Sequence, residues 1–376
     1  MKVALHGGYI TENFGDELLL VLHERWVNKN QEHKIYMPYA SKEYFDQVNA
    51  EGVKGEKAIG EAEKLIYIGG GYLGETNHDR WRWGFRFIKR KHHFPAESFQ
   101  KSNKPFAIIG AGAGPISNVW TRNKVVKMCN KADTVAVRDE QSKEYLNKYG
   151  VDPKKIIVTA DTVLSLANED VPSIAREEVA EIFKQEKRKL FVVHIGIHEG
   201  DKAYSRQAKL LIKSIAAFFN ENEHFVPVLL EDKRKATEQQ DSNEKIIRQL
   251  KGDYYRFVHK DVWTTCALLE HVDKVVTTKL HVGITAYSLG TSAFSFAAHQ
   301  KTRRFYQQID RSECCLDISE IGKEEDISKR LFEFSRRIEV LNEREISIRE
   351  ELRGKALVNK ELTERYLKIE AGKEAL

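Results

Sequence analysis

The chain has 376 residues, of which 41% are hydrophobic, 31% are charged and only 7 are proline. This composition excludes a mostly disordered protein and allows two domains that each bury a core, while a net charge of +5 is too small to predict a nucleic-acid partner. No stretch contains the roughly 20 consecutive apolar residues that a membrane-spanning helix needs.

In the first half of the chain, short apolar runs alternate with longer amphipathic ones. The short runs have the length and composition of buried strands, and the longer runs have helical periodicity. Alternation of this kind predicts a parallel sheet with helices on both faces. The expected strands are 2–6, 33–37, 64–68, 106–110, 133–137 and 155–159, and the expected helices include 16–30, 119–130 and 139–149.

A polar stretch, 168–189, separates this half from a second series with the same alternation. We therefore expect an α/β fold with two Rossmann-like domains, 1–170 and 188–315, facing a central cleft. Ligands bind such sheets beyond the carboxyl ends of the strands. The expected strands of the second series are 190–195, 225–230, 255–259, 274–278 and 292–296, with helices over 205–220, 234–250, 260–271, 282–289 and 301–309.

The last segment, 318–376, has a different pattern. From Asp326 onward, apolar residues recur three and four positions apart with charged residues between them, which predicts a long amphipathic helix. We expect this helix to pack back across the two domains. A homodimer through a coiled coil is the alternative.

Three glycine-rich segments follow predicted strands of the first half, at 6–19, 69–75 and 110–115. Glycine tolerates positive φ and close backbone approach, so such turns can present N–H groups to an anion at a helix start. None has the dinucleotide-binding spacing, and the chain has no GxxxxGK[ST] loop. Together they predict the floor of a ligand site, with Gly70, Gly71 and Gly112 lining the cleft.

Polar residues accompany the first glycine-rich segment. In "NFGDE", Asn13, Asp16 and Glu17 lie where the first strand enters its helix, and we expect them to line the cleft. Asp16 either caps the helix or acts as a base that faces the cleft, and spacing alone favours the cap.

Three other polar residues end predicted strands. Arg138 is placed to bind an anion or to form a salt bridge with Asp139 or Glu140, and Asp161 lines the cleft or caps the next turn. His194 ends the first strand of the second series and is either an acceptor contact or a buried structural histidine.

The segment "VVTTKLHVGITAYSLGT" (275–291) places Lys279 and His281 between a predicted strand and a predicted helix. By itself this pattern fits an inert histidine that is hydrogen-bonded to backbone at a helix start. It also fits a catalytic histidine with a cation beside it.

Taken in order, several segments resemble the polysaccharide pyruvyl transferase family over roughly residues 1 to 310. The resemblance implies a two-domain fold of GT-B type. It also implies an enzyme that transfers the enolpyruvyl unit of phosphoenolpyruvate onto two hydroxyls of a sugar, forming a ketal and releasing phosphate. The segments are "GYITENFGDE" (8–17), "YIGGGYL" (67–73), "IIGAGAGP" (108–115), "AVRDEQSKEYL" (136–146), "VTADTVL" (158–164) and "KLH" (279–281).

The resemblance also implies roles for individual residues. The family's R-x-H element falls on Lys279, Leu280 and His281, where lysine replaces arginine and keeps the charge without the planar fork. A later basic position of the family falls on Lys301. Lys279, Leu280, Lys301 and Arg138 would therefore bind phosphoenolpyruvate.

The implied chemistry needs a proton donor and a proton acceptor. A histidine held near phosphate and carboxylate has its acidic form favoured, so His281 is the expected general acid. Asp16, which matches the family's N-terminal carboxylate, would accept the proton of the sugar hydroxyl. Cationic side chains can balance the substrate's charge, so we expect neither a metal nor a cofactor besides phosphoenolpyruvate as co-substrate.

The segment 79–104 interleaves aromatic residues with Arg and Lys. It is either a packed strand with one apolar face or a patch that meets anionic lipid. The resemblance implies a lipid-linked oligosaccharide as acceptor, in the synthesis of a capsule or exopolysaccharide. We expect a cytoplasmic protein, because its N-terminus lacks a secretory pattern, with peripheral contact at the inner face of the cell membrane.

Two other functions remain open at the level of sequence. One is a glycosyltransferase of the same architecture that uses a nucleotide sugar, with His281 as base and Lys301 on the diphosphate. The other is a sugar-binding scaffold in which the lysine at position 279 marks lost activity.

Overall fold

The computed structural model describes residues 1–11, 13–29, 33–40, 50–52, 54–75, 84, 87, 92–197, 204–233, 238–337 and 342–368. The chain divides into two compact units. The first unit comprises Met1–Glu12, Asp16–Ser165 and Glu351–Leu376, and the second comprises Asn13–Gly15 and Leu166–Glu350.

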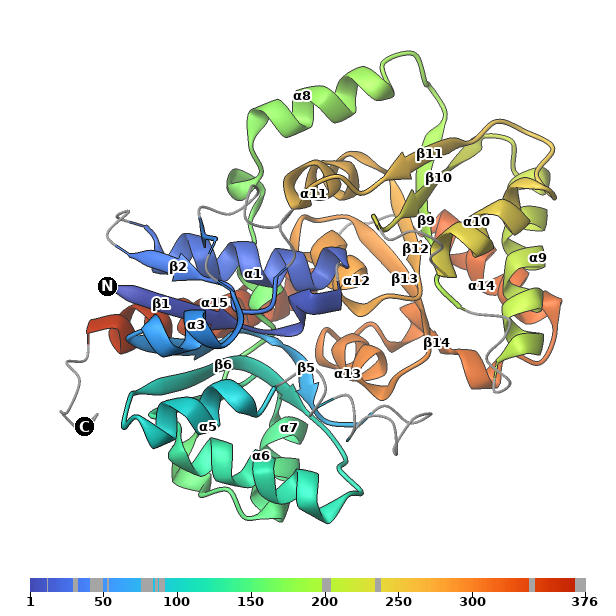
Figure 1. Cartoon of the computed structure of the whole chain (residues 1–376). Helices are drawn as coiled ribbons and strands as arrows, with labels where there is room; N and C mark the ends of the chain where they lie inside the picture. Colours follow the sequence, from blue (N-terminus) through green and yellow to red (C-terminus); the bar gives the residue numbers. More distant parts are fainter. Residues whose placement is uncertain are drawn as a thin grey trace. The chain divides into compact units, whose positions relative to one another are not determined.

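The first unit contains a parallel sheet in the order β3-β2-β1-β4-β6-β7-β8, with β5 paired to β6 (Figure 1). The sheet is buried on both faces because its strands are apolar along most of their length, as parallel sheets require. The strands are β1 (Lys2–His6), β2 (Lys34–Tyr36), β3 (Ala50–Glu51), β4 (Lys64–Tyr67), β5 (Gly70–Leu73), β6 (Phe106–Ala113), β7 (Thr134–Val137) and β8 (Ile156–Val158).

Helices cover both faces of this sheet. Leu65 and Tyr67 of β4 face a core cluster that also contains residues of α3, α5, α6 and α7. Lys64, which alternates with them along the strand, donates from Nζ to the carbonyl of Tyr366 in α15 at 2.6 Å. The helices are α1 (Phe14–Val27) from Asp16 on, α3 (Gly55–Glu61), α5 (Phe94–Lys101), α6 (Val119–Lys131), α7 (Glu140–Tyr149) and, from Glu351 on, α15 (Glu343–Lys368).

The second unit contains a parallel sheet in the order β11-β10-β9-β12-β13-β14. The first strand of the unit, β9, lies beside the fourth, β12, so the strand order reverses between them as in the Rossmann fold. The strands are β9 (Lys189–His194), β10 (Phe225–Glu231), β11 (Tyr255–Val258), β12 (Lys274–Thr277), β13 (Ser292–Ala297) and β14 (Cys315–Asp317).

Helices of the second unit lie on both faces of its sheet (Figure 1). Those that connect β9 to β11 lie on one face together with α14, and those that connect β11 to β14 lie on the other, as right-handed crossovers require. The helices are α8 (Ser173–Ile182), α9 (Ser205–Glu221), α10 (Glu238–Ile247), α11 (Val262–His271), α12 (Leu280–Ser288), α13 (Gln300–Gln308) and α14 (Glu324–Arg336).

The predicted fold class is confirmed: there are two Rossmann-like parallel sheets and a long C-terminal helix, α15. The single helix predicted from Asp326 onward was wrong, because the structure has two helices there: α14 ends at Arg336 and α15 begins at Glu343. Every predicted strand coincides with a strand of the structure within three residues at either end. The sequence did not predict β3, β5, β14, α3, α5 or α8, which are short or, for α8, mostly polar.

The C-terminal helix is held in the first unit by a buried asparagine. Asn359 is fully buried, and its Oδ1 accepts from Thr159 Oγ1 at 2.8 Å. Its Nδ2 donates to the carbonyl of Ala160 at 2.9 Å. Because an unpaired amide in the core would cost free energy, these bonds fix how α15 docks.

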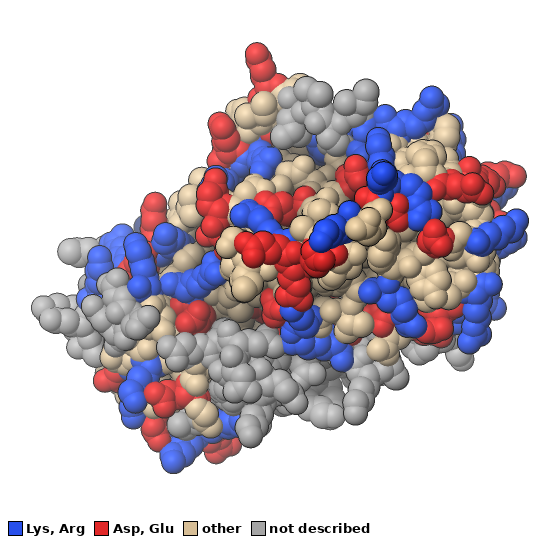
Figure 2. All heavy atoms as spheres, turned by 90° about the horizontal axis from the view of Figure 1, so that it is seen from above, with Lys and Arg blue, Asp and Glu red and all other residues tan. Residues whose placement is uncertain are grey.

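Most of the aromatic and basic part of the segment 79–104, residues 79–91, lies outside the described residues. Of its predicted aromatic and basic stretch, Phe87 is described and is 1% exposed, so its side chain belongs to the core of the first unit. From Phe94 the chain forms α5. No helix in the described part of the chain is long and apolar enough to span a membrane. Among the described residues on the face in Figure 2, acidic and basic side chains are interspersed.

One core residue predicts how stability depends on pH. His23 in α1 is fully buried, packs edge-on against Trp26 and makes no hydrogen bond with any described residue. Burial lowers the pKa of His23 to about 3, so the folded protein keeps the ring neutral while the unfolded chain protonates below about pH 6.5. Above about pH 6.5, protonation of this histidine therefore does not reduce the free energy of unfolding. Below that pH the free energy of unfolding falls progressively, because the unfolded chain binds a proton that the folded protein does not.

We expect His23→Leu to remove this dependence of the free energy of unfolding on pH. Relative to the unmodified protein, the variant should gain about 3 kcal/mol in free energy of unfolding between pH 7 and pH 4. Urea unfolding of both proteins across that range measures the difference, and the carboxylates that titrate in both cancel. Parallel curves would contradict the prediction.

Candidate functional site

Several polar residues of the second unit lie where β9 and β12 end. Ligands bind α/β sheets at such a reversal of strand order, beyond the carboxyl ends. His194 is the last residue of β9, and Thr278 follows β12. The two segments are joined by a hydrogen bond from the Gly196 amide to Thr278 Oγ1 at 2.9 Å.

The Lys-Leu-His element forms the start of α12. Thr277 Oγ1 accepts from the Lys279 amide at 2.9 Å, which fixes the turn between strand and helix. Lys279 and His281 are half-buried, whereas Leu280 between them is 6% exposed and packs into the core. Thus Leu280 anchors the helix start, and the lysine and the histidine on either side of it remain partly exposed.

Lys279 lies directly over Gly196. A Cβ added at Gly196 would come within 2.9 Å of Lys279 Cε, 3.2 Å of its Nζ and 3.1 Å of Gln239 Nε2. A larger residue here would therefore require the end of the Lys279 side chain to move. This packing directs the ammonium group toward the polar cluster of the sheet edge.

His281 packs in the same way against Gly15. A Cβ added at Gly15 would lie 2.3 Å from His281 Nδ1 and 2.4 Å from its Cβ. Gly15 belongs to the short segment Asn13–Gly15 of the second unit. The backbone of this segment thus forms one wall against the imidazole.

Asp232, which follows β10, holds that segment. Its Oδ1 accepts from the Phe14 amide at 3.4 Å, and its Oδ2 accepts from Gln239 Nε2 at 2.7 Å. The Phe14 ring in turn packs edge-on against His259, the residue after β11, with ring centroids 5.5 Å apart. His259 is itself tied by a 2.7 Å hydrogen bond between Nδ1 and Thr265 Oγ1.

His194 lies beneath this cluster and is 2% exposed. Its Nε2 is 3.9 Å from Asp232 Oδ1, and its Nδ1 is 3.5 Å from Thr277 Oγ1. Burial lowers the pKa of His194 to about 4; Asp232 opposes this shift, whereas Lys279 and His259 add to it. At neutral pH the ring is neutral, which suits a group that supports its neighbours through packing and hydrogen bonds.

Lys301 is the second residue of α13 and is half-buried. The helix begins soon after β13, so this lysine also belongs to the carboxyl edge of the second sheet. Of the predicted site residues, the second unit contains Asn13, His194, Lys279, Leu280, His281 and Lys301.

In the first unit, Arg138 and Asp161 form an ion pair. Arg138 Nη1 is 3.0 Å from Asp161 Oδ2, and its Nε is 3.6 Å from Asp139 Oδ2. A Cβ at Gly112 would meet the guanidinium at 2.7 Å, so the glycine makes room for it. Of the salt bridges that the sequence left open, the one with Asp139 is present, whereas the shorter pair with Asp161 was not predicted. Asp161 also accepts from the Val163 amide at 3.1 Å.

Two glycine-rich segments are strands where the sequence predicted turns. Gly70 and Gly71 lie in β5, and β6 extends through Gly112 to Ala113. The close approach that glycine allows is used for packing: a Cβ at Gly74 would lie 2.4 Å from the Gly114 nitrogen. Gly70 is buried with φ of 128°, and Gly71 is exposed.

The acidic residues at the start of α1 differ in exposure. Asp16 is half-buried, and its carboxylate lies over Gly8, where a Cβ would come within 2.6 Å of Oδ1. Glu17 is 3% exposed. The first unit therefore contains Asp16, Glu17, Gly70, Gly71, Gly112, Arg138 and Asp161 of the predicted residues.

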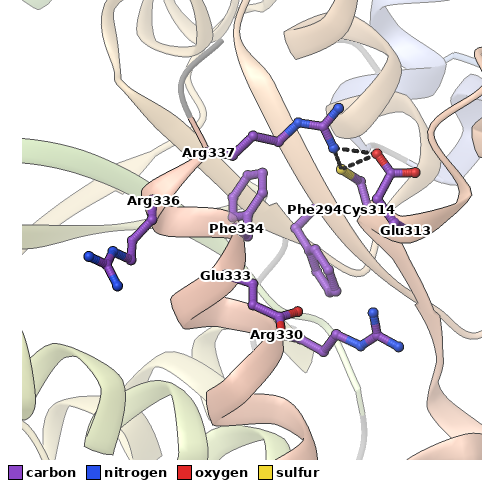
Figure 3. A pocket seen from close by; sticks show the side chains of 8 residues that line it. All are labelled: Phe294, Glu313, Cys314, Arg330, Glu333, Phe334, Arg336 and Arg337. Atoms are coloured by element: carbon purple, nitrogen blue, oxygen red, sulfur yellow. Dashed lines mark hydrogen bonds and ion pairs between the residues drawn. The ribbon is translucent and has the colours of Figure 1, made fainter.

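A separate cavity of about 330 Å³ lies in the second unit (Figure 3). It is toward the amino ends of the strands, because Lys274, the first residue of β12, donates to the Arg337 carbonyl at 2.8 Å. Arg337 points to Glu313 and Cys314 and pairs with both, whereas Arg336 points away. The lining residues are Phe294, Glu313, Cys314, Arg330, Glu333, Phe334, Arg336 and Arg337.

The cavity is at the edge of the sheet opposite to the carboxyl ends, where ligands usually bind α/β sheets, and its Arg337 forms ion pairs with Glu313 and Glu345. Among the described residues, no three His, Cys, Asp or Glu side chains are grouped so that they could hold a metal ion.

Sequence reasoning did not select Asp232, Gln239 or His259 for the site. A signal was available for two of them, because Asp232 and His259 each follow an apolar strand directly, and carboxyl ends of parallel strands share one edge. Gln239 carries no such signal, since it lies inside α10 and reaches the edge only through the packing of that helix.

Comparison with known proteins gives a family and a fold. A family model of polysaccharide pyruvyl transferases matches residues 13–300. The solved UDP-GlcNAc 2-epimerase from Neisseria meningitidis bound to UDP-GlcNAc is 12% identical, with 98% of this chain and 100% of that chain covered and a TM-score of 0.64. No curated protein sequence matches.

Two further solved structures share the fold. The UDP-GlcNAc 2-epimerase from Methanocaldococcus jannaschii in complex with UDP-GlcNAc and UDP is 13% identical, covering 96% of this chain and 99% of that chain with a TM-score of 0.61. Anabaena HepE in complex with UDP-glucose is 9% identical, covering 97% of each chain with a TM-score of 0.57.

Proposed function

Because the chain belongs to the polysaccharide pyruvyl transferase family, we propose that it transfers the enolpyruvyl unit of phosphoenolpyruvate onto two hydroxyls of a sugar. The acceptor is a sugar of a bacterial-type cell-surface polysaccharide or of its lipid-linked precursor. The observation that carries the proposal is the start of α12, where Lys279 and His281 are presented at the carboxyl edge of the second sheet.

The proposed donor site lies in the second unit. Lys279 and Lys301 supply positive charge for the phosphate and carboxylate of phosphoenolpyruvate, and both follow strands that end at one edge of the sheet. In the first unit, Arg138 is a further cation that the family pattern suggests for phosphoenolpyruvate, and ion pairs with Asp161 and Asp139 orient its guanidinium. Leu280 contributes by anchoring the helix start between the two polar residues.

The proposed reaction has two steps. His281 gives a proton to the methylene carbon of phosphoenolpyruvate, and the first sugar hydroxyl bonds to the adjacent carbon and loses its proton to Asp16. Phosphate then leaves with the electrons of its C–O bond, and the second hydroxyl bonds to the same carbon and loses its proton to the departing phosphate. The products are a methyl-bearing cyclic ketal and inorganic phosphate.

The decisive experiment combines binding with turnover. Phosphoenolpyruvate should raise the thermal unfolding temperature of the protein, and UDP or UDP-sugars should not. Incubation with phosphoenolpyruvate and a panel of glycosides or lipid-linked sugars should add the mass of a pyruvate ketal to one acceptor and release phosphate. Stabilisation by UDP-sugars alone would instead favour a nucleotide-sugar enzyme, the alternative that the shared fold leaves open.

Replacing Lys279 should weaken donor binding. We expect Lys279→Met to raise the KM for phosphoenolpyruvate by about 10- to 100-fold with less effect on the KM for the acceptor, because a hydrogen bond to a charged group contributes about 1.5–3 kcal/mol. Steady-state kinetics with each substrate varied in turn measures both constants.

The matched variant is Lys279→Arg, which keeps the charge and restores the residue that the family pattern has at this position. It should retain most of the donor affinity if the longer side chain fits over Gly196. An unchanged KM for phosphoenolpyruvate in Lys279→Met would contradict a donor-binding role.

A further inference from the structure

An exposed tryptophan stands at the carboxyl edge of the sheet in the first unit. Trp120, the second residue of α6, is 54% exposed, and its neighbour Val119 is 55% exposed. Large apolar side chains are usually buried, so an adjacent exposed pair points to a binding surface. The pair follows β6 by a short loop, and α/β sheets bind ligands beyond such strand ends.

The indole is held in place from below. Lys124 Nζ lies 4.7 Å from the centroid of the Trp120 ring, a cation–π distance, and it pairs with Glu97 Oε1 at 2.7 Å. An aromatic ring that is supported in this way loses little conformational freedom when a ligand stacks on it.

A buried carboxylate lies under the same loop. Glu75, just beyond β5, is 9% exposed, and its Oε1 accepts from the Ser117 amide at 2.7 Å, from Ser117 Oγ at 2.8 Å and from the Asn118 amide at 3.4 Å. Its Oε2 is buried and has no hydrogen-bond partner among the described residues. Buried polar atoms nearly always have a hydrogen-bond partner, so the Oε2 atom can accept a hydrogen bond from a ligand.

Asn118 connects the two features. Its backbone amide contacts Glu75, and its side chain caps α6 by accepting from the Thr121 amide at 3.0 Å. The Glu75 amide also donates to the Pro115 carbonyl at 2.8 Å, so the loop is bonded to Glu75 through both backbone and side chain. Glu75 is therefore tied by hydrogen bonds to the loop that leads into α6, two residues before Trp120.

We propose that Trp120 and Glu75 form a saccharide-binding platform, with a sugar ring stacked on the indole and a sugar hydroxyl donating to Glu75 Oε2. The inference deepens the proposed function and rests on it, because the platform is the site that selects the acceptor sugar. A sugar offers both an apolar C–H face and hydroxyl donors, which is the combination that an exposed aromatic ring and an unpaired carboxylate oxygen, both close in sequence to the same loop, can recognise. A lipid surface would have no use for the carboxylate.

Binding of methyl glycosides without phosphoenolpyruvate tests the platform separately from the reaction. Saturation-transfer NMR with the methyl glycosides of galactose, glucose, mannose and N-acetylglucosamine should detect at least one bound sugar. Affinity for that sugar should fall about tenfold in Trp120→Ala and in Glu75→Gln and should be largely kept in Trp120→Phe. Tyr254→Ala, which removes an exposed aromatic ring from the second unit, is the matched control and should bind as the unmodified protein does.

Each other outcome overturns the platform. The proposal would be overturned if Trp120→Ala bound the sugar with the same affinity as the unmodified protein, or if none of the four glycosides bound. Loss of binding to phosphatidylglycerol vesicles in Trp120→Ala with glycoside binding intact would also overturn it, because that result would make the pair a membrane contact. Where transfer is established, Trp120→Ala should raise the KM for the acceptor and leave that for phosphoenolpyruvate unchanged, whereas absence of transfer with intact glycoside binding would refute only the proposed function.

Discussion

His281→Ala should reduce pyruvyl transfer by about 10²- to 10⁴-fold, the range that a positioned general acid contributes. The side chain is half-buried at the start of α12 and is packed against Gly15, so its position is defined before substrate binds. The loss should appear in kcat at saturating phosphoenolpyruvate, because proton delivery to the methylene carbon takes place only in the transition state. Release of phosphate and formation of the ketal measure it.

The control for His281→Ala is His224→Ala. His224 is exposed, precedes β10 and lies at the amino end of the sheet, opposite to the proposed site. Activity should persist in the control, and both variants should unfold near the temperature of the unmodified protein. Transfer at more than about a tenth of the normal rate in His281→Ala would remove this residue from the proposed mechanism.

Gly15→Ala should also lose most of its activity, although it adds a single methyl group. The new Cβ would lie 2.3 Å from His281 Nδ1, a distance at which one of the two groups has to move. Displacement of a catalytic group by about 1 Å can cost about 10²-fold in rate, so we expect a loss of that order in kcat. The KM for phosphoenolpyruvate should change less, since Lys279 and Lys301 are untouched.

Two other glycines provide matched controls for the same substitution. Gly354 in α15 and Gly60 in α3 have no atom within 4 Å of an added Cβ. Gly354→Ala and Gly60→Ala should therefore leave activity unchanged and raise the free energy of unfolding by about 0.5–1 kcal/mol, because alanine favours helix. Full activity in Gly15→Ala would show that the imidazole can shift without consequence and would argue against a fixed catalytic His281.

Much of the fold could be predicted from the sequence because its signals are local. Runs such as "KVALH" at 2–6 and "FVPVLL" at 225–230 are apolar over the length of a strand, and each coincides with a strand of the structure. The prediction missed helix α8 in the polar stretch 168–189, because this helix is mostly exposed and its apolar face is narrow. Similarly, the glycines of β5 and β6 indicate close packing but do not distinguish a turn from a strand.

For the site, the sequence by itself determined that Lys279 and His281 stand between a strand and a helix, since that follows from residue order and periodicity. Only the tertiary structure decided that β9 lies beside β12, so that Lys279 crosses Gly196 and His194 is buried beneath it. The tertiary structure likewise determines that Gly15 packs against His281 and that Asp232 accepts a hydrogen bond from the Phe14 amide. Strand order and such contacts depend on the packing of segments far apart along the chain, and the local pattern of residues does not encode that packing.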